Sequence, residues 1–188
     1  MCNQGKIAMV GTAPFAVWLI PAPSDRRWLS KVIQDYAAEY STPVFEPHVT
    51  LYSGEIQPSE NLSEIIAESV APASPITLEV MGLNYTADFF KTGFITFASI
   101  ERLSQLSCAI CDRLSTPKEY LLEPHLSLIY KDIPIEQKRL AMLRFVVSVQ
   151  TVTFDTVKVV MPGAEGWSDV AHWTEQSRYS LAQSAPVG

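Results

Sequence analysis

The hexapeptide EPHVTL, residues 46–51, recurs as EPHLSL, residues 123–128. Each position of the second copy is identical to the first or conservatively replaced, and the copies are 77 residues apart (125 minus 48). Internal similarity of this kind predicts two structural units related by pseudo-symmetry. Two of the chain's three histidines, His48 and His125, stand at matching places in this repeat.

Both copies read as short strands, and the side chains of a strand alternate between its two faces. His48 and Thr50 therefore share one face, as His125 and Ser127 do. The apolar residues between and after them point the other way and anchor each strand in a core. If the two units pack side by side, two imidazoles and two hydroxyls meet in one cleft.

That set of groups suits phosphodiester chemistry. The ordinary pKa of histidine is about 6.5, so one ring can accept a proton from water while the other protonates the leaving alkoxide. The hydroxyls of Thr50 and Ser127 can donate hydrogen bonds to the non-bridging phosphate oxygens, where charge builds up in the transition state. The chemistry requires neither a metal nor a nucleophilic cysteine. We take His125 as the base and His48 as the acid, although pseudo-symmetry leaves the reverse assignment open.

Helical and strand patterns alternate along the whole chain, and no Pro/Gly/Ser-rich linker separates two halves. We therefore expect one α+β domain over residues 1–188, with segments 1–13 and 183–188 peripheral. The first helix is expected to be capped by Ser24-Asp25. The patterns predict strands at 15–20, 47–52, 76–85, 93–99, 124–130, 146–162 and 170–181, and helices at 26–40, 59–70, 101–114 and from 134 onward.

Composition narrows the class of protein. Hydrophobic residues make up 47% of the chain and charged residues 18%, which supplies a buried core and argues against disorder. The net charge of -6 argues against a stable complex with long nucleic acid, which needs clustered Lys and Arg. Three cysteines without framework spacing indicate a reducing, cytoplasmic setting. The apolar stretch at 7–23 is interrupted by prolines, so we expect a core strand there and no membrane segment.

The paired PHVT and PHLS motifs, at 47–50 and 124–127, resemble the signature of the two-histidine phosphoesterase superfamily. More narrowly, the chain is similar to the plant cyclic phosphodiesterases, which act on ADP-ribose 1″,2″-cyclic phosphate and nucleoside 2′,3′-cyclic phosphates. The segments VWLIP at 17–21, FEPHVT at 45–50, PHLSLIY at 124–130 and WTE at 173–175 carry the resemblance and occur in family order.

The resemblance implies a bilobal fold, with two pseudo-symmetric lobes of antiparallel sheet and outer helices around a central cleft. It also implies that Trp18 lines the cleft beside the substrate and that Tyr130 contacts the phosphate. Strand alternation from His125 would put Ile129, not Tyr130, on the site face, so Tyr130 needs a strand end or a bulge to reach in. The disulfides of the plant enzymes cannot be reproduced with the cysteines of this chain. The expected protein is a monomer that uses no cofactor and binds a small cyclic phosphate.

Three alternatives stay open at this stage. His48 and His125 could be metal ligands with His172 as a third, although His172 lies in no similar motif. The enzyme could act on the 2′,3′-cyclic phosphate or 2′-5′ linkage of RNA, or the chain could be a non-catalytic nucleotide-binding module. The sequence does not choose between Phe89 and Phe90 as a contact for a base.

Overall fold

The computed structural model describes residues 11–181, which form seven strands and four α-helices with one short 3₁₀ turn. The elements follow the predicted order closely. They are β1 (Ala13–Pro21), α1 (Pro23–Tyr40), β2 (Val49–Ile56), α2 (Leu62–Val70), β3 (Ile76–Asn84), β4 (Gly93–Phe97), α3 (Glu101–Cys111), β5 (His125–Ile129), α4 (Ile135–Arg144), β6 (Thr151–Met161), the 3₁₀ turn Val170–His172 and β7 (Thr174–Ser180).

Several boundaries differ from the expectation: β6 begins at Thr151 and not at 146, and the expected strand from 170 begins only at Thr174, after the 3₁₀ turn. Two further differences lie close to the repeated motif or the first helix. Helix α1 begins at Pro23 without a side-chain cap, so the predicted cap at Ser24-Asp25 is wrong. Proline suits the first helical position, because the N–H that it lacks would have no partner inside the helix. Strand β2 begins at Val49, so His48 ends the irregular segment 42–48 and lies just before the strand. His125, in contrast, is the first residue of β5.

The sheet closes on itself. Its order is β1-β2-β5-β4-β3-β6-β7, all neighbours are antiparallel, and an additional pairing joins β1 to β6. Six strands therefore form a ring, and β7 pairs with residues 156–161 of β6, beyond the part of β6 that pairs with β3. Exchanging β1, β2 and β3 for β4, β5 and β6 leaves every pairing of the ring unchanged. The repeat in the sequence is thus a pseudo-two-fold in the topology.

The pseudo-two-fold passes between the two copies of the repeated motif. Val49 of β2 pairs with Leu126 of β5, and these two residues are 77 positions apart (126 minus 49), the same offset as the histidines. Each strand therefore pairs with its own symmetry mate at the position that follows the histidine. This pairing places both histidines beside the axis, His125 at the start of β5 and His48 directly before β2.

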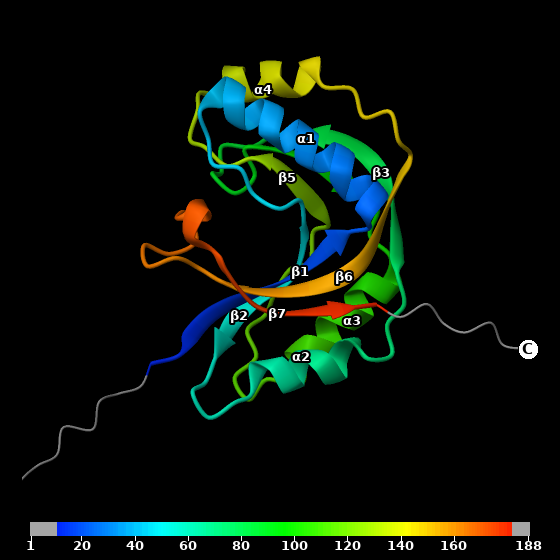
Figure 1. Ribbon diagram of the computed structural model, residues 1–188, viewed down its shortest axis with the longest axis vertical. Coiled ribbons are helices and arrows are strands. Elements are labelled where there is room, and N and C mark those ends of the chain that lie inside the picture. The colour runs from blue at the N-terminus through cyan, green and yellow to red at the C-terminus, as the bar shows by residue number, and fades with distance from the viewer. Residues whose placement is uncertain (1–10, 182–188) are drawn as a thin grey trace, which may run out of the picture.

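The helices form two pairs at opposite ends of the sheet, α1 with α4 and α2 with α3 (Figure 1). The Tyr36 hydroxyl of α1 donates to the Ala141 carbonyl of α4 at 2.9 Å, and the Ser69 hydroxyl of α2 donates to the Ala109 carbonyl of α3 at 3.2 Å. Helix α1 packs against β5 and α3 against β2, so each of these two helices covers a strand of the other half of the repeat. The expected α+β fold with two pseudo-symmetric lobes is confirmed.

Strand β1 is buried on both faces, which explains its continuous apolar sequence. Its odd-numbered residues from Phe15 to Leu19 join the main core. Its even-numbered residues form a second, smaller cluster that faces the site: Ala16, Trp18 and Ile20 with Val160, packed against Trp167 and Trp173. The strand therefore holds the site rigidly against the core.

The outer ends of the chain bear on two expectations. Residues 1–10 and 182–188, which hold most of the segments expected to be peripheral, lie outside the described residues, and Ala13 already begins β1. Among the helices found between residues 11 and 181, none has the length and apolar character to cross a bilayer.

Candidate active site

A cavity of about 290 Å³ opens over the second cluster of β1 and receives both repeated motifs. Aromatic rings form most of its wall, and its ionisable groups are two imidazoles, one lysine, one aspartate and two phenols. The residues that line it are Ala16, Trp18, His48, Thr50, Ser53, Asp88, Phe90, Lys91, Tyr120, His125, Tyr130, Trp167 and Trp173.

His48 is held by two contacts. Its ring stacks on Trp18, with centroids 3.6 Å apart and planes 12° from parallel, and its exposed fraction is 4%. Its Nδ1 lies 2.7 Å from the backbone carbonyl oxygen of Glu46, which can only accept a hydrogen bond. Nδ1 therefore carries a proton, and in the neutral ring the Nε2 lone pair is free.

His125 repeats this arrangement in the other half. Its Nδ1 lies 2.7 Å from the carbonyl oxygen of Glu123, again two residues earlier in the chain. Its ring meets Phe94 edge-on at 5.3 Å instead of stacking on an indole, and the side chain is half-buried. Both imidazoles are thus fixed in one tautomer, with Nε2 left for chemistry.

The two histidines differ in burial, and burial sets their basicity. Removal from water disfavours the charged ring and lowers the pKa of His48 to about 4, against the opposing hydrogen bond to Glu46. Burial also lowers the pKa of His125, with Lys91 adding to the effect and the hydrogen bond to Glu123 opposing it. Because it is more deeply buried, His48 is the ring that is more strongly held in its neutral form.

The two motif hydroxyls are used differently, which pseudo-symmetry did not predict. Thr50 lines the cavity. Ser127 is buried and does not line the cavity, and its hydroxyl donates to the backbone carbonyl of Phe90 at 2.8 Å. Ser127 therefore ties the β3–β4 loop to β5 in this structure, while Thr50 faces the space that a ligand would occupy.

Tyr130 reaches the cavity because β5 ends at Ile129, one residue before it. Beyond the strand end, the chain no longer follows the alternation that would turn Tyr130 away. Its hydroxyl lies 3.4 Å from Nε2 of His48, and burial raises its pKa to about 12. The phenol therefore stays protonated and can donate toward His48 or toward a ligand placed between them. Trp18 lies in the wall as well, beneath His48.

The β3–β4 loop supplies a wall that sequence reasoning had not assigned. Phe90 and Lys91 line the cavity, whereas Phe89 packs beside Tyr130 with ring centroids 6.1 Å apart. The loop is built locally, because the Asp88 carboxylate accepts from the Phe90 amide at 2.7 Å. Of the two phenylalanines, Phe90 is the one that faces the cavity.

Three further aromatic residues that line the cavity, Tyr120, Trp167 and Trp173, were not singled out as site residues from the sequence. Tyr120 donates to the Thr50 carbonyl at 3.4 Å, and Trp173 donates from its indole N–H to the Trp167 carbonyl at 2.9 Å. Trp173 did fall in a segment that carried the family resemblance. The other two lie on irregular stretches without periodicity, so no local pattern could have indicated them.

His172 does not join the other two histidines. It is exposed, and its Nδ1 lies 2.6 Å from the Asp169 carboxylate, which raises the His172 pKa. Across residues 11–181, no group of three or more His, Cys, Asp or Glu side chains could hold a metal ion. The three-histidine arrangement considered for a metal site is therefore not formed.

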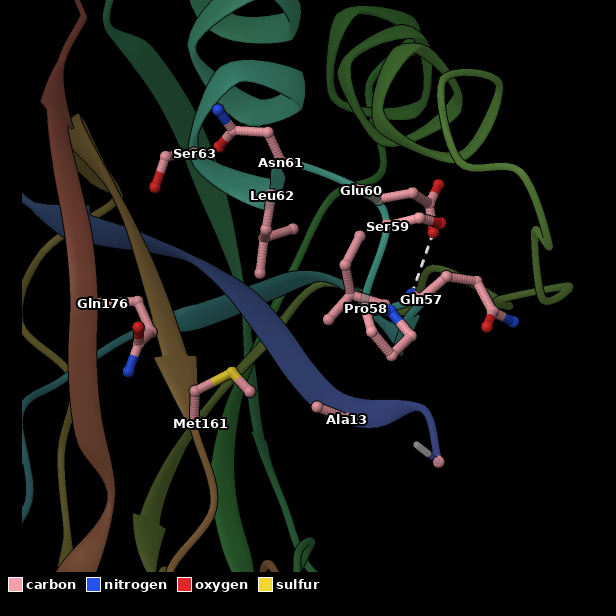
Figure 2. Close-up of a pocket in the computed structure, with 12 residues that line it drawn as sticks. Ala13, Gln57, Pro58, Ser59, Glu60, Asn61, Leu62, Ser63, Met161 and Gln176 are labelled. Carbon is pink, nitrogen blue, oxygen red and sulfur yellow. Dashed lines mark hydrogen bonds between the residues drawn. The ribbon is translucent and has the colours of Figure 1, made fainter. Parts of the chain in front are cut away.

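A larger hollow of about 550 Å³ lies elsewhere, between the start of β1 and the start of α2 (Figure 2). Its one carboxylate, Glu60, accepts hydrogen bonds from the backbone amides of Gln57 at 2.9 Å and Ser115 at 2.7 Å. These contacts hold two loops together, so the carboxylate of this hollow has a structural role.

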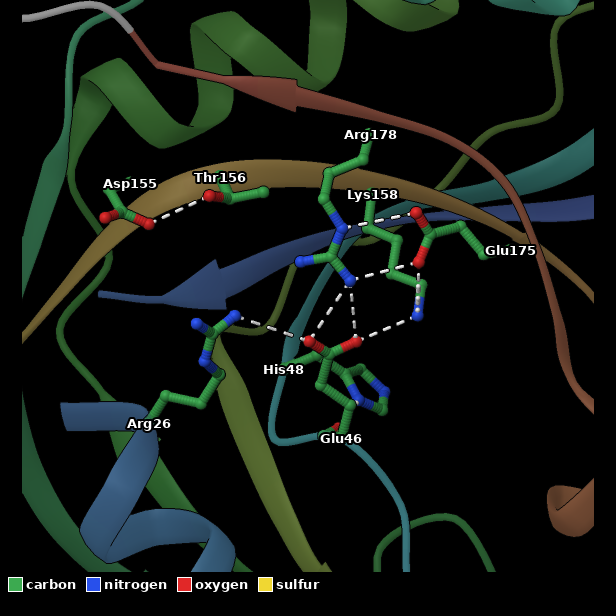
Figure 3. A network of polar contacts seen from close by, with 8 residues as sticks. All are labelled: Arg26, Glu46, His48, Asp155, Thr156, Lys158, Glu175 and Arg178. Atoms are coloured by element: carbon green, nitrogen blue, oxygen red, sulfur yellow. Dashed lines mark hydrogen bonds and ion pairs between the residues drawn. The ribbon is translucent and has the colours of Figure 1, made fainter. Parts of the chain in front are cut away.

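A cluster of five charged side chains lies beside His48, and Figure 3 shows it with Glu46 at its centre. One member, Lys158, also lies over the Trp18 ring. Glu46 pairs with Lys158 at 2.8 Å, with Arg178 at 3.2 Å and with Arg26 at 3.6 Å. Glu175 completes the cluster by contacting Lys158 and Arg178, each at 3.0 Å. Burial would raise the pKa of Glu46, but the hydrogen bonds and charges of Lys158 and Arg178 hold it below its usual value.

Comparisons with known proteins identify a relative of this chain and solved structures of the same fold. A cyclic phosphodiesterase of Arabidopsis thaliana is 22% identical over 127 residues, which cover 66% of this chain and 69% of that protein. The structure of E. coli LigT complexed with 3′-AMP aligns with a TM-score of 0.60 and 13% identity, covering 92% of this chain and all of LigT (100%). A protein of Thermus thermophilus aligns with a TM-score of 0.55 and 14% identity, covering 89% and 97% of the two chains.

The structural matches at these identities show a shared fold. The family model described as "Cyclic phosphodiesterase-like protein" matches residues 13–174, a span that includes both copies of the motif and the whole lining of the cavity. The chain therefore belongs to the family of cyclic phosphodiesterase-like proteins.

Proposed function

We propose that this protein hydrolyses small ribose cyclic phosphates, ADP-ribose 1″,2″-cyclic phosphate and nucleoside 2′,3′-cyclic phosphates, to monoesters by two-histidine acid–base catalysis. One observation carries the proposal. Two imidazoles from symmetry-related positions line one cavity, and a backbone carbonyl engages Nδ1 of each at 2.7 Å. Each ring therefore has only Nε2 free for proton transfer to or from a substrate.

The difference in burial favours His48 as the base and His125 as the acid, the reverse of the assignment favoured from the sequence. His48 is buried and neutral, so its Nε2 can take a proton from an attacking water. As water oxygen bonds to phosphorus, the bond from phosphorus to one ribose oxygen breaks. His125, which is more open to solvent and adjacent to the Glu123 carboxylate, gives its Nε2 proton to that oxygen.

Thr50 and Tyr130 are proposed to donate hydrogen bonds to the phosphate. Both line the cavity, and the Tyr130 phenol stays protonated at neutral pH. Donors aimed at the oxygens where charge develops lower the barrier. Trp18 is proposed to support the substrate and the His48 ring, and Ser127 to hold the loop unless a ligand draws its hydroxyl away from Phe90.

The size and charge of the cavity favour a small substrate over RNA. Its volume of about 290 Å³ suits a nucleotide-sized fragment, and among the residues of 11–181 that line it Lys91 is the one lysine or arginine. An RNA-end enzyme would need further cations to follow a phosphate backbone. A steep loss of turnover with salt, joined to a preference for RNA oligomers, would support RNA as the substrate. We further propose that the protein acts as a cytoplasmic monomer without metal or other cofactor.

The test is a turnover screen in EDTA with the two cyclic phosphate classes and a short RNA that ends in a 2′,3′-cyclic phosphate. The variants His48→Ala and His125→Ala should each lower kcat by roughly a hundredfold or more while staying folded. Full activity in either variant, or loss of activity on chelation alone, would contradict the proposed mechanism. Binding of nucleotides without turnover of any cyclic phosphate would support a non-catalytic module instead.

A further inference from the structure

The two glutamates that precede the Pro-His pairs have matching surroundings. Glu46 and Glu123 are symmetry mates, and the backbone carbonyl of each accepts the hydrogen bond from its own histidine. The carboxylate of each is also ion-paired, Glu46 with Lys158 of β6 and Glu123 with Lys91 of the β3–β4 loop. A side chain fixed by an ion pair also restrains the carbonyl of the same residue, and so restrains the imidazole bound to it.

The ion pairs of Glu46 and Glu123 differ in number, and the backbone around the two histidines differs as well. Glu123 also lies in an irregular segment, residues 117–124, but His125 itself is the first residue of β5 and pairs with Thr96 of β4. Glu46 lies in the irregular segment 42–48, which has no ladder of its own. Its carboxylate is held instead from three elements, by Arg26 of α1, Lys158 of β6 and Arg178 of β7 (Figure 3). The larger set of ion pairs thus stands where the backbone gives the histidine less support.

We infer that Glu46, Lys158 and Arg178 are positioning residues for His48: their ion pairs hold its ring on Trp18, and their charges act on its free nitrogen. The inference rests on the proposed function in one respect, namely that His48 acts as the base. Three cations, Arg26, Lys158 and Arg178, surround two carboxylates, Glu46 and Glu175, so the cluster carries one net positive charge.

The charged groups that face His48 act in opposite directions. Burial is the largest cause of the lowered His48 pKa. The nearby His125 ring and Lys158 lower it further, while the Glu46 carboxylate raises it. Lys158 lies 5.9 Å from the centroid of Trp18, and that ring stacks on His48 at 3.6 Å. The ammonium group is therefore within about 10 Å of the imidazole, a distance at which charge is only partly screened. Tyr130 faces His48 as a neutral phenol.

Because the cluster contains charges of both signs, removing a cation and removing a carboxylate should shift the His48 pKa in opposite directions. A merely structural role of the cluster would not produce this pattern. In Lys158→Met, the loss of a cation should raise the His48 pKa by roughly 0.3 to 1 unit. In Glu46→Gln, the loss of a carboxylate leaves the cations uncompensated and should lower it. Lys158→Arg keeps the charge and should restore the wild-type value. Lys91→Met is the matched control, which should raise the pKa of His125 and leave that of His48 in place.

The pKa values are measured by nitrogen-15 NMR titration of both imidazoles in the free full-length protein, which needs no substrate. The acidic limb of kcat/KM should move in the same directions. Shifts of one sign in both Lys158→Met and Glu46→Gln, or no shift in either, would overturn the inference even if turnover were normal. If Glu46→Gln does not fold, Arg178→Met takes its place and should raise the His48 pKa, as Lys158→Met does. Opposite shifts without cyclic phosphate turnover would instead contradict the proposed function and leave the positioning role intact.

Discussion

Lowering the pH should destabilise this protein through His48, because the folded state holds that ring neutral. Its pKa falls from an ordinary 6.5 to about 4 on folding. Between these values the unfolded chain binds a proton that the folded chain refuses, so stability rises with pH through this window. The contribution is complete above the unfolded pKa and is lost as the pH falls through the folded one.

The expected magnitude follows from the two pKa values. Between about pH 7 and about pH 4.5, this one group should reduce the free energy of unfolding by about 2 kcal/mol. The side chain is almost fully buried, so little solvent screening reduces the effect. The assay is urea unfolding at both pH values, followed by the fluorescence of the four tryptophans.

The variant His48→Gln isolates the effect, because it removes the titrating ring while keeping a polar side chain of similar reach. Its loss of stability on acidification should be smaller than that of the wild type by about 2 kcal/mol. His125→Gln is the matched control, and its effect should have the same sign and be smaller, since His125 is only half-buried. Equal acid sensitivity in the wild type and His48→Gln would refute the reasoning from burial.

Three other predictions concern catalysis. Thr50→Val should lower kcat/KM by roughly a hundredfold or more, the scale for losing an oxyanion donor. Ser127→Ala should chiefly lower the free energy of unfolding, by about 1–3 kcal/mol, because the Phe90 carbonyl loses its donor. Equal kinetic losses in both variants would show that the two hydroxyls act alike. Tyr130→Phe should cost about tenfold in kcat/KM, measured with a cyclic mononucleotide, and no loss would exclude its hydroxyl from the reaction. The profile of kcat/KM against pH should be bell-shaped, with its acidic limb near the His48 pKa of about 4 and its basic limb below 6.5, and a flat profile would contradict proton exchange by the histidines.

Local pattern was enough to place most elements, because each rests on a short-range rule. The continuous apolar run of β1 reflects burial on both faces, and the spacing of Leu29, Ile33, Tyr36 and Ala37 reflects one buried face of α1. Boundaries were less certain where two rules compete. Ser24-Asp25 looks like a cap, but Pro23 already fits the first turn, so the helix starts earlier.

The site was predictable only as far as the repeat extends. EPHVTL and EPHLSL indicate by strand alternation which side chains share a face, and they indicate pseudo-symmetry because they recur. Alternation cannot say which residues meet beyond a strand end, as with Tyr130, nor which loops close the cavity, as with Lys91 and Trp167. Those contacts depend on segments far apart in the sequence.

The sequence by itself therefore determined the two halves, the paired histidines and the chemistry that they can perform, because these follow from residue type and a period of two. The tertiary structure decided how the halves are used. Closure of the ring brings Val49 against Leu126 and so puts both imidazoles in one cavity. Unequal burial then breaks the symmetry of the repeat, since Trp18 covers His48 while His125 stays partly open, and Ser127 turns to Phe90 while Thr50 faces the cavity. Two nearly identical hexapeptides acquire different pKa values and different hydrogen-bond partners because dielectric and contacts belong to the packed environment and not to the residues.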